Sequence, residues 1–301
     1  MENILFILVL LAIGFGLRYL KAFPKNTAEV LTAFVIHVSL PALVLVQIPK
    51  IQFSSALIWP LFMPWVMILV SAAAVYLLAR LFQWSRPVTG ALLLLVPLGN
   101  TSFFGIPMVE AFFGTEAISY ALLYDQLGTF LALATYGTVI ISLYGKGQST
   151  GFRPILKKVL TFPPLIALVL AVTLQFLAPR GYPEEIQFML QSIAATLIPL
   201  VIIAVGLKME FRVAPGQALP LTVGLLLKLV AAPLLALLLI QIAGATHPAA
   251  KVAVFEAGMP AQISAWALAM SAGLAPKLSA MLVGFGILLS FVTLYGLHLL
   301  L

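Results

Sequence analysis

The sequence predicts an all-α integral membrane protein with ten transmembrane helices. Of its 301 residues, 63% are hydrophobic and 8% are charged, whereas an ordinary soluble domain carries about 25% charged residues. The apolar runs are continuous, as in 4–16 and 281–289. Continuous runs indicate helices, because the strands of membrane barrels alternate apolar and polar residues. Other spanning structures would leave backbone groups unpaired in hydrocarbon.

Proline, glycine and clusters of charge divide the chain into ten expected spans. The spans are 3–21, 27–48, 56–82, 88–113, 117–144, 158–178, 185–206, 217–242, 249–273 and 277–300. Most are close to the roughly 20 residues that a bilayer requires. The first apolar run lacks a basic leader and a small-residue cleavage site, so we expect a first helix rather than a signal peptide.

The 16 lysines and arginines predict the orientation. Lys50, Arg180 and Lys251 lie in even-numbered connections, and Lys228 lies within a span. The others lie in odd-numbered connections: Arg18, Lys21, Lys25, Arg80, Arg86, Lys146, Arg153, Lys157, Lys158, Lys208, Arg212 and Lys277. Because basic loops remain in the cytoplasm, we expect both termini outside the cell. This rule also explains the net charge of +7 without a nucleic-acid partner.

Two halves of five spans flank a basic linker, 146–157. An odd number of spans per half means that 1–145 and 158–301 enter the membrane in opposite directions, as inverted repeats do. Weak internal similarity agrees with this arrangement. Ser39-Leu40-Pro41 in the second span resembles Leu197-Ile198-Pro199 in the seventh.

The fourth and ninth spans are interrupted at corresponding positions. The interrupting residues are Pro97, Gly99, Asn100, Gly105 and Pro107 in the fourth span, and Gly258 and Pro260 in the ninth. A break leaves the N–H groups of the following half-helix unpaired, and these groups with the helix dipole form an anion site. Glycine and proline also kink membrane helices without binding a ligand, but matching breaks in two repeats favour a binding site.

These segments resemble the auxin efflux carrier family of plants and bacteria. The fourth span reads Gly-Asn-Thr-Ser-Phe-Phe-Gly-Ile-Pro from Gly99 to Pro107, the ninth reads Glu-Ala-Gly-Met-Pro-Ala-Gln from Glu256 to Gln262, and Leu282–Thr293 resembles the last helix of the family. The resemblance implies a fold similar to those of bile acid transporters and sodium/proton antiporters, in which helices 1, 2, 6 and 7 form a scaffold and helices 3–5 and 8–10 form a transport domain.

The resemblance also implies the site and the setting. Asn100 matches the asparagine that binds the substrate carboxylate, and Pro107 and Pro260 match the crossover prolines. The short linker is typical of bacterial members, which are described as permeases for malate, malonate and other organic acids. It further implies a homodimer in the plasma membrane, the inner membrane of a bacterium.

Three charged residues lie within the expected spans: Asp125, Lys228 and Glu256. Intramembrane charges are costly, so they indicate function unless they pair. They either couple transport to a proton or a sodium ion, or form a static lysine–carboxylate pair between helices.

The polar residues that border the breaks have a weaker signal. Thr101, Ser102 and Gln262 either bind substrate or pair the freed backbone groups. Ser39, two residues before Pro41, is a further candidate for substrate binding.

The sequence therefore predicts a secondary transporter of a small organic anion, working by an elevator-like or rocking movement. An exporter of an auxin-like aromatic acid or an amino acid is the alternative, and an ion channel is a remote one, because each span has few polar residues. Catalysis is not expected, because a single aspartate and three scattered histidines provide no protease pair. No metal site or cofactor is expected, apart from the coupling ion.

Overall fold

The computed structural model of the chain is helical. It describes residues 2–51, 53–145, 152–177, 182–209 and 216–301, and no strand occurs among them. Helices keep their backbone hydrogen bonds within one segment, which suits a chain surrounded by lipid. Six helical segments are long and apolar enough to cross a membrane: Thr27–Lys50, Ser55–Leu81, Thr115–Tyr144, Glu184–Lys208, Ala218–Ile242 and Pro276–Leu300. Shorter apolar helices lie between them: Ile4–Leu17, Arg86–Leu95, Thr101–Phe113 and Pro163–Leu177.

Short 3₁₀ and π turns, labelled η, subdivide these segments. The first half contains α1 (Glu2–Leu17), α2 (Thr27–Phe34), η1 (Val35–Ser39), α3 (Leu40–Gln47), η2 (Ile48–Lys50), η3 (Ser55–Leu57), α4 (Ile58–Leu81), α5 (Arg86–Leu95), η4 (Thr101–Gly105), α6 (Ile106–Phe113), η5 (Thr115–Ala117), α7 (Ile118–Tyr124), η6 (Asp125–Thr129), α8 (Phe130–Ala134) and α9 (Tyr136–Tyr144). The second half contains α10 (Phe152–Leu160), α11 (Pro163–Leu177), α12 (Glu184–Ala194), α13 (Leu197–Lys208), α14 (Ala218–Leu226), η7 (Leu227–Ala231), α15 (Ala232–Ile242), α16 (Pro248–Ala257), α17 (Ile263–Ser271) and α18 (Pro276–Leu300).

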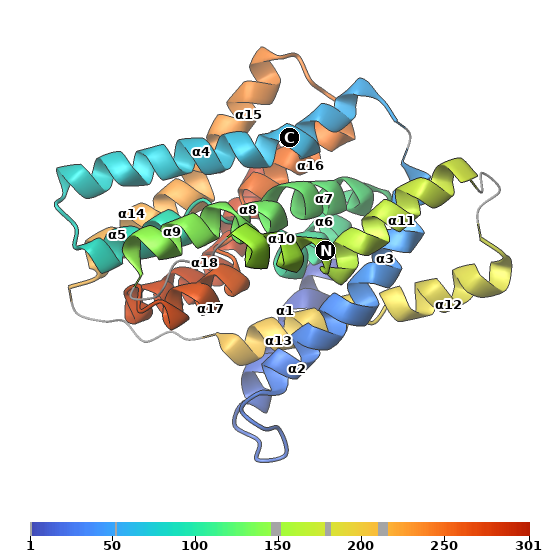
Figure 1. The fold of residues 1–301 in the computed structure, drawn as a ribbon, viewed down its shortest axis with the longest axis horizontal. Coiled ribbons are helices and arrows are strands. Elements are labelled where there is room, and N and C mark those ends of the chain that lie inside the picture. The colour runs from blue at the N-terminus through green and yellow to red at the C-terminus, as the bar shows by residue number, and fades with distance from the viewer. Residues whose placement is uncertain (1, 52, 146–151, 178–181, 210–215) are drawn as a thin grey trace.

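The helices pack in two groups. The first group contains α1, α2, α3, α11, α12 and α13, with α1 against α13 and α3 against both α11 and α12. The second group contains α4–α9 and α14–α18, where α16 packs on α4, α7 and α15, and α5 packs on α9. In Figure 1 the first group occupies the lower right of the view, and α4, α5, α9, α14 and α15 lie at the upper left.

Helices α1 and α13 approach closely because each presents a glycine to the other. A Cβ added at Gly14 would lie 2.9 Å from the Cα of Ile203 and closer still to its carbonyl oxygen. A Cβ added at Gly206 would lie 2.9 Å from the backbone nitrogen of Phe15. Small residues permit this approach, and van der Waals packing is a main source of helix association in lipid.

Residues 158–178 were expected to form a single helix, but the structure divides this segment between two helices. The structure has α10 before it, a break at Thr161–Phe162, and then α11 from Pro163. Of the expected linker 146–157, residues 146–151 lie outside the described residues, and the remainder is the beginning of α10. Prolines 163 and 164 cannot continue a helix, but they are tolerated in its first turn, which accounts for the later start.

Candidate functional site

The two interrupted spans cross at their breaks. An isolated antiparallel bridge joins the segment between α5 and η4 to the segment between α16 and α17. The backbone N–H of Asn100 donates to the carbonyl of Pro260 at 2.7 Å, and that of Gln262 donates to the carbonyl of Leu98 at 3.0 Å. Each break therefore satisfies backbone groups of the other, as non-helical backbone inside a membrane requires.

Two half-helices begin at the crossing. The η4–α6 half-helix starts at Thr101 after Asn100, and α17 starts at Ile263 after Gln262. The first N–H groups of a helix lack partners within it, and the dipole makes this end positive. Two such ends beside each other form an environment that favours a carboxylate.

A buried pocket of about 240 Å³ lies at these helix starts. It is lined by Ile36, Leu40, Asn100, Ser102, Phe103, Phe130, Leu133, Phe162, Gln262 and Ser264. Asn100 is 1% exposed and Gln262 is 7% exposed. Neither Nδ2 of Asn100 nor Oε1 of Gln262 has a hydrogen-bond partner among the described residues. Buried polar groups are normally paired, so these two amides can bind a ligand.

The pocket adjoins a wider cavity of about 400 Å³. The two cavities share Ile36, Phe103, Leu133 and Ser264 as lining residues. The wider cavity extends between α2, the end of α13 and α17, where Lys208 forms an ion pair with Glu29 at 3.2 Å. Together, the pocket and the wider cavity therefore extend toward one side of the protein. It is the side on which the odd-numbered connections join the helices.

An aromatic stack forms part of the pocket wall. The rings of Phe130 and Phe162 lie parallel, with centroids 3.6 Å apart and an interplanar angle of 11°. Phe130 begins α8 in the second packing group, whereas Phe162 precedes α11 in the first. The stack therefore joins the two groups beside the pocket.

Asp125 lies just behind the start of the first half-helix. It is 1% exposed and begins the π turn η6. Thr101 donates its hydroxyl to Oδ1 at 2.6 Å, and Gln126 donates Nε2 to Oδ2 at 2.7 Å. Because both carboxylate oxygens accept a hydrogen bond, the arrangement suits an ionised aspartate.

Lys228 lies where the preceding helix α16 ends at the crossing, beside Gly99 in the other break. Its Nζ donates to the carbonyl of Ala257, the last residue of α16, at 3.3 Å. A Cβ added at Gly99 would lie 3.1 Å from the same nitrogen, so the glycine makes room for the ammonium. The C-terminal end of a helix is negative, and the lysine compensates that charge.

Glu256 is fully buried one residue before the end of α16. Neither carboxyl oxygen has a hydrogen-bond partner among the described residues. The described part of the chain contains the ion pair Lys208–Glu29 within 4.0 Å and none between Lys228 and Glu256. A Cβ on Gly105 would lie 2.8 Å from Oε1 and closer to Oε2. Gly105, a candidate from the sequence, thus contacts the carboxyl group of Glu256.

The remaining residues expected at the site lie in different places. Thr101 and Ser102 open the first half-helix, and Pro107 is buried in the first turn of α6. Gly258 packs against α18, because an added Cβ would lie 3.2 Å from Leu297. Ser39 shares a hydrogen bond of 2.7 Å with Thr196 inside the first packing group.

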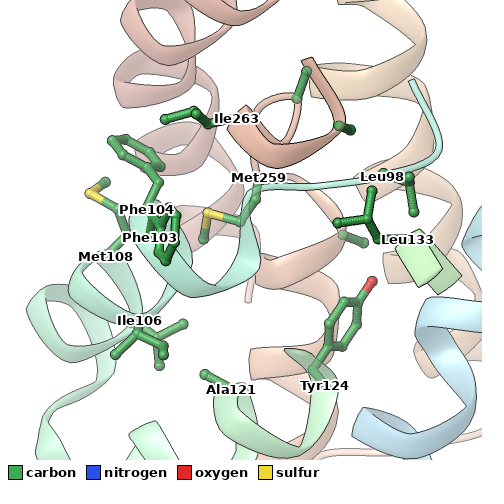
Figure 2. Close-up of a cluster of buried hydrophobic side chains, with 14 of the residues drawn as sticks. Leu98, Phe103, Phe104, Ile106, Met108, Ala121, Tyr124, Leu133, Met259 and Ile263 are labelled. Carbon is green, nitrogen blue, oxygen red and sulfur yellow. The ribbon is translucent and has the colours of Figure 1, made fainter. Parts of the chain in front are cut away.

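Apolar packing holds the crossing in place. In Figure 2, Phe104 and Met108 lie on one side of the crossing, Leu98 and Leu133 lie on the other, and the hydroxyl of Tyr124 points toward the side of Leu133. All five side chains are buried, with at most 6% of each exposed. Close packing of this kind keeps the half-helix ends in one geometry.

Sequence reasoning missed Gln126, Phe130 and Phe162. Gln126 directly follows Asp125 within the same span, so the sequence did indicate a second polar residue beside the intramembrane carboxylate. The two phenylalanines had no signal, because the chain contains 20 of them and phenylalanine is ordinary in membrane helices.

Among the described residues, four π turns lie within the helices: η1, η4, η6 and η7. They contain Ser39, Thr101, Asp125 and Lys228, each named from the sequence. Turns of this type are rare and often mark functional sites. Three of the four surround the crossing, whereas η1 contributes its Ile36 to the pocket wall.

The fold and the crossing define a multi-pass membrane transport protein. Residues 1–297 match the family described as membrane transport protein. The chain therefore belongs to this family, the auxin efflux carrier-like family that the two interrupted spans predicted. Members of this family are transporters and not enzymes, which agrees with the expectation from the sequence.

Two archaeal relatives extend the comparison. An uncharacterized transporter of Methanocaldococcus jannaschii is 30% identical over 216 residues, which cover 70% of this chain and 69% of the relative. An uncharacterized transporter of Methanothermobacter thermautotrophicus is 28% identical over 296 residues, which cover 97% of this chain and 95% of the relative. Similarity thus extends over almost the entire chain.

Proposed function

We propose that this protein is a secondary transporter of a small organic carboxylate, which binds at the crossing of the two interrupted spans. The observation that carries the proposal is the pocket in which the unpartnered amides of Asn100 and Gln262 meet two half-helix starts. The amides and the N–H groups supply hydrogen-bond donors, and the helix ends supply positive potential. A carboxylate accepts hydrogen bonds from Nδ2 of Asn100 and from the N–H groups, whereas the free Oε1 of Gln262 accepts one from a hydroxyl or another donor of the substrate.

The proposed architecture has ten spans in two inverted repeats. Its support is that six long segments, two shorter helices (α1 and α11) and two helix pairs interrupted at corresponding positions account for ten crossings. The first packing group corresponds to the expected scaffold, and the second corresponds to the expected transport domain. Alternating access then occurs by movement of the second group against the first.

The proposed orientation has both termini outside the plasma membrane, as the distribution of basic residues predicts. In this orientation the wider cavity, with Glu29 and Lys208 at its wall, opens toward the cytoplasm. The present conformation is then inward-facing. The homodimer expected from the resemblance is part of the same proposal.

The pocket favours a compact organic acid over an amino acid. Among its lining residues, none is acidic, so an ammonium group would have no ionised partner there. This argues against an amino acid. The rings of Phe103, Phe130 and Phe162 support an aromatic acid as the second candidate. The volume of about 240 Å³ fits a compact acid such as malate or malonate more readily.

Uptake into proteoliposomes tests the proposal. Purified protein is supplied with labelled malate, malonate, indole-3-acetate or an amino acid, each as exchange against the same internal compound and as net uptake. We expect saturable exchange of one acid. Asn100→Ala should weaken the apparent affinity about tenfold to hundredfold, since hydrogen bonds to charged groups contribute about 1.5–3 kcal/mol.

Asn26→Ala is the matched control, because Asn26 is exposed and its side chain caps no helix. It should leave exchange unchanged. Equal affinity in Asn100→Ala and wild type would remove Asn100 from the site. Uptake that does not saturate would favour a channel, and no exchange of any acid by folded protein would contradict an anion carrier.

A further inference from the structure

The environment of Glu256 differs from that of every other charged residue at the crossing. Asp125 accepts two hydrogen bonds, and Lys228 donates one to Ala257. Glu256 is 0% exposed, and neither carboxyl oxygen has a hydrogen-bond partner among the described residues. A buried carboxylate without partners is strongly disfavoured when it is ionised, whereas the protonated acid is tolerated. The geometry therefore suits a carboxylic acid that holds a proton.

The carbonyl group that could coordinate a sodium ion at the end of α16 already accepts a hydrogen bond from Lys228. In transporters with broken helices, carbonyl groups at the C-terminal ends of half-helices coordinate such a cation. The ammonium of Lys228 already binds the last carbonyl of α16 and lies against Gly99 in the other break. A second cation beside it would be repelled. A proton bound covalently to Glu256 needs neither the carbonyl ligands nor the space.

The charges at the crossing indicate how this proton relates to the substrate. With Glu256 protonated, Asp125 and Lys228 cancel, and the buried crossing is neutral. A bound monocarboxylate such as indole-3-acetate adds one negative charge, and a dicarboxylate such as malate adds two. If Glu256 also lost its proton, the crossing would hold one further uncompensated negative charge. Anion binding and protonation of Glu256 therefore favour each other, and by linkage each strengthens the other equally.

The groups that act electrostatically on Glu256 are few. Asp125 of η6 and Lys228 of η7 are its charged partners, and the phenol of Tyr124 on α7 also interacts with it electrostatically. Elements that pack on α16 have further ionisable residues outside this set: Arg80 of α4, Glu110 of α6, Glu116 of η5, and Lys277 and His298 of α18.

A short structural connection joins the acid to the pocket. The carboxyl group of Glu256 lies against Gly105, whose N–H donates to the carbonyl of Asn100 at 2.9 Å. The π turn η4 therefore has Glu256 behind it and the pocket amide at its start. A change in charge at Glu256 acts on this turn directly.

We propose that Glu256 carries one proton with each substrate anion, so that the protein is a proton–anion symporter. This inference rests on the proposed function. The proton adds to a carboxyl oxygen of Glu256 on the side where the anion binds, and it leaves to water on the side where the anion is released. No other bond changes.

Glu256→Gln is the decisive variant, because glutamine mimics the neutral acid but cannot release a proton. The probes are labelled malate and, in parallel, labelled indole-3-acetate, in proteoliposomes with imposed proton or sodium gradients. In wild type we expect an inward proton gradient to drive accumulation, and apparent affinity to rise up to about tenfold per unit decrease in pH. Glu256→Gln should keep exchange but lose accumulation and the pH dependence.

Glu185→Gln is the control, since Glu185 is exposed in α12. It should behave as wild type. Exchange without any proton-driven accumulation in wild type would overturn the symport while leaving the carrier intact. Accumulation driven by sodium and insensitive to pH would assign the coupling to that ion. Loss of exchange in folded Glu256→Gln would also overturn it, because the residue would then be needed for binding or movement.

A measurement without substrate tests the bound proton itself. Infrared difference spectra between wild type and Glu256→Gln should contain a carbonyl band of a protonated carboxylic acid in wild type. The symmetric stretch of a carboxylate in its place would show that Glu256 is ionised and would contradict the inference, whether or not either probe is transported.

Discussion

The two packing groups are both apolar, but they bury different polar residues. The buried polar side chains described in the first group are Ser39 and Gln47. The second group buries Asn100, Thr101, Asp125, Gln126, Lys228, Glu256 and Gln262 around the crossing. Close glycine contacts such as Gly14 with α13 contribute to holding the first group together. The charges of the second group are expensive in a membrane, so each must be compensated or neutralised where it lies.

The largest effect is expected in the second group, from Lys228→Met. The substitution removes the donor to Ala257 and leaves Asp125 without a compensating charge. Removing one member of a buried charge set costs about 3–5 kcal/mol. The free energy of unfolding in detergent measures this loss. Lys277→Met is the control, because Lys277 is exposed. Adding Asp125→Asn should restore part of the loss, and unchanged stability in Lys228→Met would contradict a structural role for the ammonium.

A smaller effect is expected in the first group, from Gly206→Ala. The new Cβ would overlap the backbone of α1, and overpacking costs about 1–3 kcal/mol. Substrate affinity of the folded fraction should remain that of wild type, because neither Gly206 nor the α1 backbone it contacts lines the pocket. Gly296→Ala is the matched control, since a Cβ there meets nothing within 4 Å. A change in affinity without a change in stability would mean that this contact moves during transport.

The smallest effect is expected from Ser39→Ala. The hydroxyl shares a hydrogen bond with Thr196, and such a bond contributes about 0.5–1.5 kcal/mol. Thr196→Val should cost more, because the Thr196 hydroxyl also donates to the carbonyl of Ile193, and the double variant should cost little more than Thr196→Val alone. From the sequence, Ser39 was instead a candidate for substrate binding, and exchange assays test this alternative. Weaker substrate binding in Ser39→Ala but not in Thr196→Val would support it.

Much of the fold could be predicted from the sequence, because its physical cause is local. Apolar runs must become helices in lipid, and proline and glycine must interrupt them. The breaks near Asn100 and near Pro260 were therefore visible in the chain, and so were the three intramembrane charges. The start of α11 was missed because Pro163 and Pro164 were included within a longer apolar run.

The sequence by itself determined a helical membrane transporter with two interrupted spans, because composition and helix-breaking residues act within a few positions of the chain. The tertiary structure alone decided which polar groups meet. Thr101 and Gln126 pair with Asp125, Lys228 binds the end of α16 instead of Glu256, and Ser39 turns to Thr196. Those choices depend on distances between helices that are far apart in the chain, and helical periodicity does not encode such distances.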